Sequence, residues 1–206
     1  MNGLLLDFGG VLTTNVFESF REFCAAEGLD PDAVKRLFRE HPEALELVRG
    51  LETGDLSEDE FGERFGALLG LEGRAGLVDR MFGAVREDEQ MVGAVRRARA
   101  AGIRTGLVSN SMGAGRYDRS RFPELFDGVV ISGEVGMHKP QPEIFLLGAE
   151  RAGVDPQQCV FVDDLRENCD GAEAVGMTAV LHRGAETTLP ELERLLGVSF
   201  AAAPGT

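Results

Sequence analysis

The spacing of hydrophobic residues changes along this chain and divides it into segments of different predicted structure. Leu4 to Leu6 form a short apolar run that stops at Asp-Phe-Gly-Gly, a pattern that predicts a buried parallel strand ending in a loop. From residue 16 the apolar positions recur every three or four residues, and beyond residue 86 short apolar runs alternate with helical patterns. The chain is therefore predicted to be a mixed α/β protein.

Residues 15–85 carry helical patterns and lack strand patterns. Apolar residues recur at helical spacing at Val16, Phe17, Phe20, Phe23 and Cys24. A second helix is expected after Asp30-Pro31, because a capping residue followed by proline favours a helix start. Ser57 followed by Glu60 has the form of a capping box before a third helix. We predict an all-helical insert over 15–85.

The remaining residues, 1–14 and 86–206, are predicted to form one core. Short apolar runs that predict further strands lie at 103–108, 128–132, 159–162 and 178–181. Helical patterns separate these runs, a final helix is expected near Leu189, and residues 201–206 are expected to fray. Repeated strand–helix units imply a doubly wound parallel sheet, whose ligand crevice lies at the carboxyl ends of the strands.

Composition and charge narrow the possible partners. The 206 residues include 21 Lys and Arg against 35 Asp and Glu, a formal net charge of −14. Such a field repels a polyanionic duplex, so we expect no nucleic acid partner. A phosphorylated substrate would need local positive charge from a metal ion, a lysine or backbone N–H groups.

Cysteine usage and the N-terminal residues favour a cytoplasmic protein. Cys24, Cys159 and Cys169 show no CxxC pairing, which is typical of reduced thiols in that compartment. The first residues lack a basic region and their apolar run is broken by Asp7, so we expect no signal peptide. Since no stretch approaches the ~20 apolar residues of a membrane helix, we expect no membrane partner.

Polar residues at three predicted strand ends form the candidate site. Asp7 ends the first strand, Ser109 ends the second, and the pair Asp163-Asp164 ends a later one, while Lys139 lies on a loop between them. Taken singly, each residue has a purely structural alternative to a catalytic role: Ser109 can cap a helix, and Lys139 can be a solvated charge. Adjacent acids, however, repel each other unless a cation or a proton intervenes.

Together these residues predict phosphoryl chemistry. Three converging carboxylates make a hard oxygen site that suits Mg²⁺. One carboxylate, Asp7, can attack phosphorus and form an aspartyl-phosphate, provided that Mg²⁺ and Lys139 neutralise the phosphoryl charge. Ser109 and the backbone N–H groups after it can hold the other phosphoryl oxygens.

The order of these motifs resembles the haloacid dehalogenase (HAD) superfamily of aspartate-nucleophile hydrolases. The motifs that carry the likeness are "LLLDFGGVLTT", "IRTGLVSNS", "GMHKPQPEIF" and "CVFVDDLRENCDGAEAVGM". The resemblance implies Asp7 as nucleophile, Ser109 with Asn110 and Lys139 as phosphate-binding residues, and Asp163 with Asp164 as metal ligands. It also implies a Rossmannoid core, a helical C1 cap over the site, and a monomer or homodimer.

Gly9 departs from the pattern of the family's phosphatases. A second Asp two residues after the nucleophile usually protonates the leaving group and then activates water, and Gly9 cannot do either. Its carbonyl remains, and in the family the carbonyl is the metal ligand at this position. A glycine here also resembles a subgroup of sugar-1-phosphatase-like members. The fourth motif is similar to that subgroup and to the phosphatase domain of soluble epoxide hydrolases, where an Asn at the place of Asn168 often lies near the site.

The leading hypothesis is a Mg²⁺-dependent hydrolase of a small phosphorylated metabolite. Two alternatives stay open: a metal-binding protein with little turnover, and a 2-haloacid dehalogenase, which the acid pair disfavours because its substrate is anionic. A phosphomutase would need the missing acid, and a receiver domain has its acid pair first in the chain. The polar candidates for substrate selection, each with a solvent-facing position as its alternative, are Asn15, Arg39, His41 and Arg49.

Overall fold

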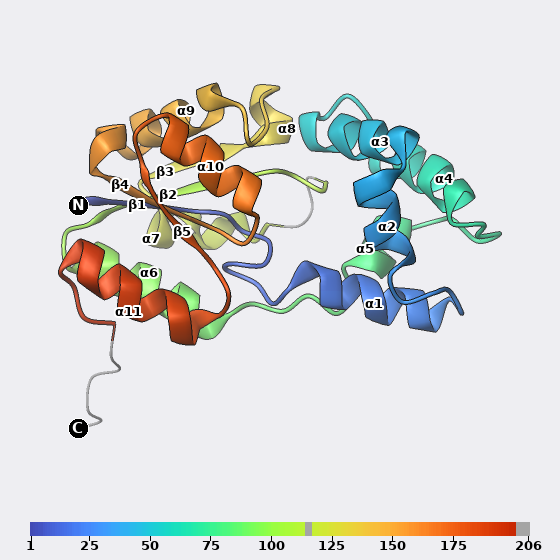
Figure 1. Ribbon diagram of the computed structural model, residues 1–206, viewed down its shortest axis with the longest axis horizontal. Coiled ribbons are helices and arrows are strands. Elements are labelled where there is room, and N and C mark those ends of the chain that lie inside the picture. The colour runs from blue at the N-terminus through green and yellow to red at the C-terminus, as the bar shows by residue number, and fades with distance from the viewer. Residues whose placement is uncertain (114–116, 201–206) are drawn as a thin grey trace.

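A parallel sheet forms the centre of the larger lobe in the computed structural model, which describes residues 1–113 and 117–200 (Figure 1). Its strands are β1 (Gly3–Leu6), β2 (Arg104–Ser109), β3 (Gly128–Ile131), β4 (Cys159–Asp163) and β5 (Thr178–Leu181). Their order is β3-β2-β1-β4-β5, and all neighbouring pairs are parallel. The predicted doubly wound sheet is therefore confirmed, while the expected tail at 201–206 lies outside the described residues.

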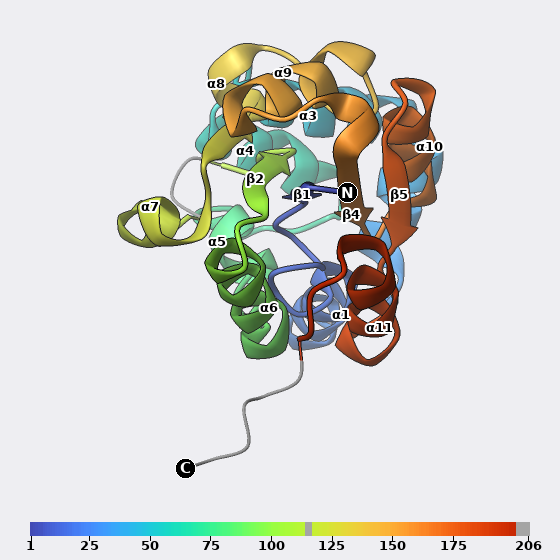
Figure 2. The ribbon, with the colours of Figure 1, turned by 90° about the vertical axis from the view of Figure 1, so that its left-hand side faces the viewer.

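Helices cover both faces of this sheet (Figure 2). One face packs on α6 (Glu89–Ala100), α7 (Phe122–Leu125) and α11 (Ala185–Leu196), and the other on α9 (Pro142–Ala152) and α10 (Arg166–Ala174). Short segments complete the lobe: α8 (Ser132–Val135) and the 3₁₀ turns η2 (Arg119–Arg121) and η3 (Pro156–Gln158). Strand β1 is fully buried because Leu4 and Leu6 face one helical layer and Leu5 faces the other.

The last helix begins earlier than its sequence pattern predicts. It starts at Ala185 rather than near Leu189, and Pro190 lies inside it. Ala185 and Thr188 are buried, and the Thr188 hydroxyl hydrogen-bonds to the ring of His182 at 2.9 Å. Packing of the first turn against the core therefore stabilises helix ahead of a residue that sequence rules treat as a helix start.

The second lobe consists of five helices between β1 and α6. They are α1 (Val16–Ala26), α2 (Ala33–Glu40), α3 (Pro42–Thr53), α4 (Glu58–Leu68) and α5 (Leu77–Met81). Their apolar faces enclose a separate core in which Phe20 meets Phe38 and Phe38 meets Phe65 edge to face. The capping box of Ser57 and Glu60 is confirmed, whereas α3 and α5 are helices that the sequence pattern left unassigned.

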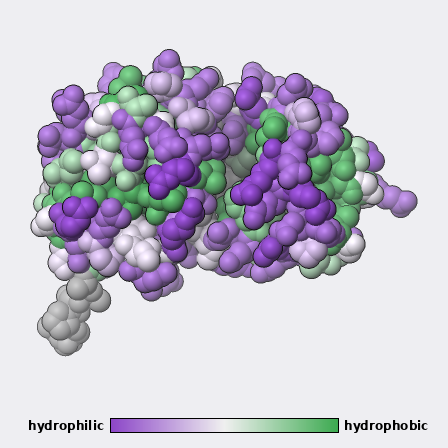
Figure 3. All heavy atoms as spheres, in the orientation of Figure 1, coloured by the Kyte–Doolittle hydropathy of each residue, from purple (hydrophilic) through white to green (hydrophobic). Residues whose placement is uncertain are grey.

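Two connections join the lobes. The chain segments entering and leaving the helical lobe run side by side, with Thr14 N–H donating to Arg86 O at 2.7 Å and Asp88 N–H to Leu12 O at 2.9 Å. At the other edge, the end of α3 lies against α8, where the Ser132 hydroxyl donates to the backbone carbonyl of Glu52 (Figure 1). The space between these two connections is closed on two sides and forms a hollow between the lobes (Figure 3).

The described part of the chain includes no helix long and apolar enough to cross a membrane. All three cysteines are buried and carry free thiols.

Candidate active site

The parallel register brings the predicted site residues to one edge of the sheet. Leu6, the last residue of β1, pairs with Leu107 of β2 and with Val162 of β4. Asp7 follows directly, and its backbone N–H donates to Val162 O at 2.9 Å. Because parallel strands end at the same side, Asp7 lies beside the ends of β2 and β4, at Ser109 and Asp163.

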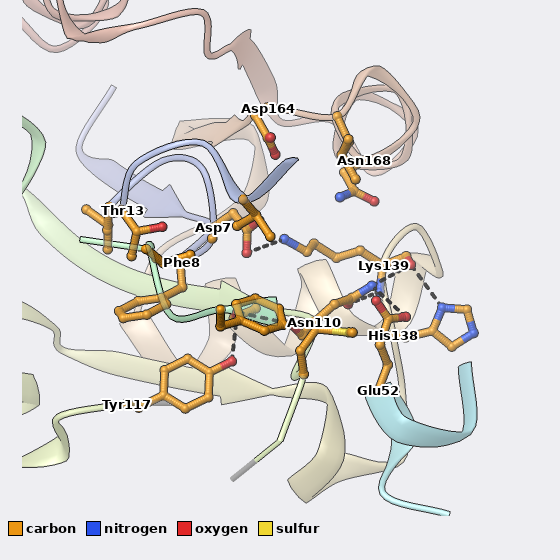
Figure 4. Close-up of a pocket in the computed structure, with 18 of the residues that line it drawn as sticks. Asp7, Phe8, Thr13, Glu52, Asn110, Tyr117, His138, Lys139, Asp164 and Asn168 are labelled. Carbon is orange, nitrogen blue, oxygen red and sulfur yellow. Dashed lines mark hydrogen bonds and ion pairs between the residues drawn. The ribbon is translucent and has the colours of Figure 1, made fainter. Parts of the chain in front are cut away.

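Lys139 connects two of the carboxylates. Its ammonium Nζ lies 2.8 Å from Asp7 Oδ1 (Figure 4). The same Nζ lies 2.7 Å from Asp163 Oδ2, and the Lys139 side chain is 0% exposed. A buried ammonium is costly unless it is paired, and here each carboxylate supplies one charge-assisted hydrogen bond. Burial by itself lowers the pKa of Lys139, but the charges of Asp163 and Asp7 outweigh it and raise that pKa above its usual range. Lys139 is therefore a permanent cation here.

Asp163 is fully buried and held from several sides. Its Oδ1 accepts hydrogen bonds from the Leu165 backbone N–H at 2.9 Å and from the Asn168 amide at 3.0 Å. Asn168 is only 3% exposed and also lies 3.1 Å from Asp163 Oδ2. Asn168 is thus a buried partner of Asp163 and not a polar residue on the surface of α10. The contact restricts the orientation of the Asp163 carboxylate.

Asp164 completes an acidic cluster with room for a cation. The carboxylate oxygens of Asp7, Asp163 and Asp164 lie within 4.8 Å of one another. Burial raises the pKa of Asp7 to about 7 and that of Asp164 to about 6, and neighbouring carboxylates add to both shifts. The cluster therefore has more negative charge than Lys139 balances, and hard oxygen donors in this arrangement fit Mg²⁺.

The loop after β1 contains Gly9 and Gly10, and only position 10 requires glycine. Gly10 has φ +74°, and a Cβ there would lie 2.6 Å from Asp164 Oδ2, so a side chain would displace the acid. Gly9 is different, because a Cβ would meet only Val16 Cγ2, at 3.3 Å. A side chain at position 9 thus needs only a small movement of Val16, and its absence is not imposed by crowding.

Ser109 and Asn110 differ in what they contact. The Ser109 hydroxyl lies 3.0 Å from the Tyr117 hydroxyl, at the end of β2. The Asn110 side chain holds the backbone of Lys139, accepting from its N–H at 2.8 Å and donating to its carbonyl at 3.1 Å (Figure 4). The structure thus places Asn110 as a support for Lys139. Tyr117 was not singled out from the sequence, since a lone tyrosine in a loop carries no motif.

Glu52 is the second residue that the sequence did not reveal. It comes from α3 of the helical lobe, and its Oε2 accepts a hydrogen bond from the Asn110 amide at 3.3 Å. Burial raises its pKa to about 7, against the lowering effect of Lys139 and of the Asn110 bond. In sequence it is one of several glutamates on an amphipathic helix, so only the docking of α3 on the core identifies it.

A cavity of about 1070 Å³ between the lobes contains this cluster. Its floor includes Asp7, Ser109 and Lys139, and its walls are largely aromatic and aliphatic side chains of both lobes. Arg39 and Arg49, two of the four polar candidates for substrate selection, line it. The other two serve as helix caps: Asn15 accepts from Phe17 N–H at 2.8 Å, and the ring of His41 accepts from Ala44 N–H at 3.4 Å.

Comparison with known proteins gives both a family and relatives. The family described as haloacid dehalogenase-like hydrolase matches residues 1–176. The glyceraldehyde 3-phosphate phosphatase of Methanopyrus kandleri is 32% identical over 111 residues, 52% of this chain and 48% of that protein. The bifunctional epoxide hydrolase 2 of Rattus norvegicus is 37% identical over 79 residues, 38% of this chain and 14% of that protein. The matches thus span less than half the length of these relatives.

Solved structures match over nearly the whole chain. A predicted HAD-like family hydrolase from Porphyromonas gingivalis superposes with a TM-score of 0.71 at 26% identity, covering 95% of this chain and 98% of its own. A HAD family enzyme from Bacteroides thetaiotaomicron, solved as a complex with magnesium and inorganic phosphate, has a TM-score of 0.63 at 22% identity, covering 89% and 94%. The second likeness is one of fold.

Proposed function

Because this chain belongs to the haloacid dehalogenase-like hydrolases, we propose that it is a Mg²⁺-dependent phosphomonoester hydrolase acting on a small phosphorylated metabolite. One observation carries the proposal: a buried ammonium joins Asp7 to Asp163 at 2.8 and 2.7 Å, with Asp164 beside them. An anion can approach three clustered carboxylates only when cations neutralise them, and this arrangement supplies one and has room for another.

In the proposed reaction Asp7 is the nucleophile. One Asp7 oxygen bonds to phosphorus while the bond from phosphorus to the leaving oxygen breaks, which gives an aspartyl-phosphate. Lys139 stays charged and holds the Asp7 carboxylate in place, and Ser109 donates to a phosphoryl oxygen. Asn110 acts through Lys139, whose backbone it fixes. Residues 15–85 are proposed to act as the cap that excludes water.

Asp7, Asp163, Asp164 and the carbonyl of Gly9 would hold the Mg²⁺ ion. When bound, the ion supplies Lewis-acid neutralisation of phosphoryl charge. Support comes from the oxygen-only donor set and from the magnesium and phosphate present in the Bacteroides thetaiotaomicron neighbour. The relatives whose names specify phosphatases support the phosphomonoester as substrate.

Metal removal tests the metal site directly. With p-nitrophenyl phosphate and a panel of sugar phosphates, chelator should reduce turnover to background, and Mg²⁺ should restore it. Without substrate, Mg²⁺ should raise the melting temperature of the protein, because an ion that binds only the folded state stabilises it. Asp164→Asn should weaken Mg²⁺ binding by at least about 10-fold, as measured by this thermal shift.

The same assay separates the alternatives. A Mg²⁺-induced thermal shift without turnover on any phosphate ester would indicate a metal-binding protein with little activity and would contradict the proposed reaction. Halide release from 2-haloacids in the presence of chelator would instead identify a dehalogenase. Asp170→Asn, on the exposed side of α10, is the matched control for the loss of one carboxylate, and its metal affinity should equal that of the wild type.

Gly9→Asp should increase the hydrolysis of alkyl phosphates, whose leaving groups need a proton. General acid–base assistance is typically worth about 10²–10⁴-fold, so we expect an increase of up to about 10²-fold in kcat for such esters. Val16 must move by a few tenths of an ångström to admit the side chain. Activity toward p-nitrophenyl phosphate should change little, and Gly9→Ala controls for crowding. A fall for every substrate, with Gly9→Ala unaffected, would contradict this account of the missing acid.

A further inference from the structure

We propose that Glu52, on α3 of the helical lobe, is the general acid and then the general base of the reaction. This inference rests on the proposed phosphatase function and names the group that serves where Gly9 has no side chain. It follows from where α3 ends, what the Glu52 carboxyl contacts, and which other proton donors line the cavity.

The backbone at Glu52 is fixed to the sheet-containing lobe. Its carbonyl accepts from the Ser132 hydroxyl, whose oxygen accepts in turn from Ser111 N–H at 2.8 Å. Two residues on, Gly54 ends α3 with φ +81°, and a Cβ there would lie only 3.0 Å from Gly133 O. This close approach of two backbones holds the end of α3 against α8. Glu52 is therefore carried by the helical lobe but positioned by the core.

The Glu52 side chain is directed into the cavity that contains Asp7. It projects from α3 toward Asn110 and Lys139 (Figure 4), and it lines the same cavity as Asp7 and Ser109. In-line displacement places the leaving oxygen opposite the attacking one. Because Asp7 attacks from the core, the leaving oxygen must face the helical lobe, and a carboxyl carried by that lobe lies on the side where the proton is needed.

The surroundings of Glu52 permit it to hold a proton near neutral pH. Burial raises its pKa to about 7, and the charges of Asp7 and Glu167 also raise it, while Lys139 and the Asn110 amide lower it. An acid–base group works best when its pKa is near the working pH. The four groups that affect the Glu52 pKa come from four segments other than α3, so that pKa is a property of the assembled site.

Four other titratable groups along the cavity are less suited to this role than Glu52. The Asp118 pKa is lowered by hydrogen bonds from Ser120, and Glu87 is paired with Arg121. The His138 ring is 2.9 Å from the Lys139 carbonyl and lies beyond the Lys139 backbone from Asp7 (Figure 4). Burial raises the pKa of Tyr117 to about 12, which makes its phenol a weak acid.

The proton balance of both steps closes with Glu52. In the first step the Glu52 carboxyl gives its proton to the leaving oxygen as the ester bond to phosphorus breaks, releasing an alcohol and leaving Glu52 ionised. In the second step Glu52 takes a proton from water as the water oxygen bonds to phosphorus and the bond to Asp7 breaks. Phosphate leaves, and Asp7 is a carboxylate and Glu52 a carboxyl again.

The role of Glu52 is tested by measuring how kcat of the Glu52→Gln variant depends on the leaving group of the ester. The amide is isosteric and can still accept from Asn110, so the fold should be retained. For alkyl phosphates we expect kcat to fall about 10²–10⁴-fold. For p-nitrophenyl phosphate the first step needs no acid, so one equivalent of nitrophenolate should appear in a burst. The second step then lacks its base, and mass spectrometry after acid quench should find a phosphoryl group on the peptide containing Asp7.

Control variants distinguish this role from a structural one. Glu46→Gln makes the same change of charge on α3 outside the cavity lining and should behave as wild type. In the Glu52→Gln background, Gly9→Asp should restore alkyl phosphate hydrolysis. Equal losses for alkyl and aryl esters without a burst, or wild-type activity on both, would overturn the assignment of Glu52. If the proposed function itself were wrong, the wild-type protein would hydrolyse none of these esters.

Discussion

Asp7→Asn is expected to abolish phosphate ester hydrolysis, with kcat falling roughly 10⁴-fold or more. An amide is a poor nucleophile, and the neighbouring carboxylate of Asp163 is already engaged by other groups. Lys139 holds Asp163 at 2.7 Å, and Asn168 and the Leu165 N–H occupy its oxygens as well. The measurement is single-turnover kinetics with p-nitrophenyl phosphate in saturating Mg²⁺.

The stability of Asp7→Asn provides its internal control. Burial raises the pKa of Asp7 to about 7, so ionised Asp7 is destabilised where it lies. A neutral amide of the same shape should therefore leave the melting temperature at pH 8 unchanged or higher. No burst of nitrophenolate should appear, in contrast to Glu52→Gln. Retained turnover in a folded Asp7→Asn protein would show that another group attacks phosphorus.

Lys139→Met is expected to impair both activity and stability. The ammonium is fully buried between Asp7 and Asp163, so its removal leaves two carboxylates without their cation. Removing one member of a buried ion pair typically costs about 3–5 kcal/mol, and we expect the free energy of unfolding at pH 8 to fall by about that amount. Loss of a charge-stabilising donor should lower kcat by about 10²–10³-fold.

The pH dependence of the stability lost in Lys139→Met identifies the cause of that loss. Lys139 lowers the pKa of Asp7, so without Lys139 that pKa rises further above its unfolded value. The folded variant then takes up a proton at Asp7 more readily than the unfolded chain does. The stability deficit should then be largest at pH 8 and shrink as the pH falls toward 5, as urea denaturation can measure. Lys35→Met, at the only other lysine of the chain, is the matched control and should show no such trend. A deficit independent of pH would indicate lost packing instead.

Much of the sheet-containing lobe follows from local sequence patterns. Short apolar runs such as Leu4 to Leu6 predict buried parallel strands, and the register of the observed sheet agrees. The predicted start of α11, near Leu189, is wrong. Burial of Ala185 and Thr188 outweighs the preference of Pro190 for the first turn of a helix. Helix α3 escaped prediction, although Pro42 at its first position is a typical start signal.

The sequence by itself determined which groups are available: one acid after the first strand, an acid pair after a later one, a lysine between them and no acid at position 9. Strand ends in a parallel sheet share an edge, so these groups were predictable neighbours. Only the tertiary structure decided that Asn168 is buried against Asp163 and that Glu52 enters the cavity beside Asn110. The Asn168 contact spans only five residues but requires the first turn of α10 to fold back over the end of β4. The Glu52 contact joins residues 58 positions apart, and the burial that gives Glu52 its raised pKa exists only after the two lobes meet.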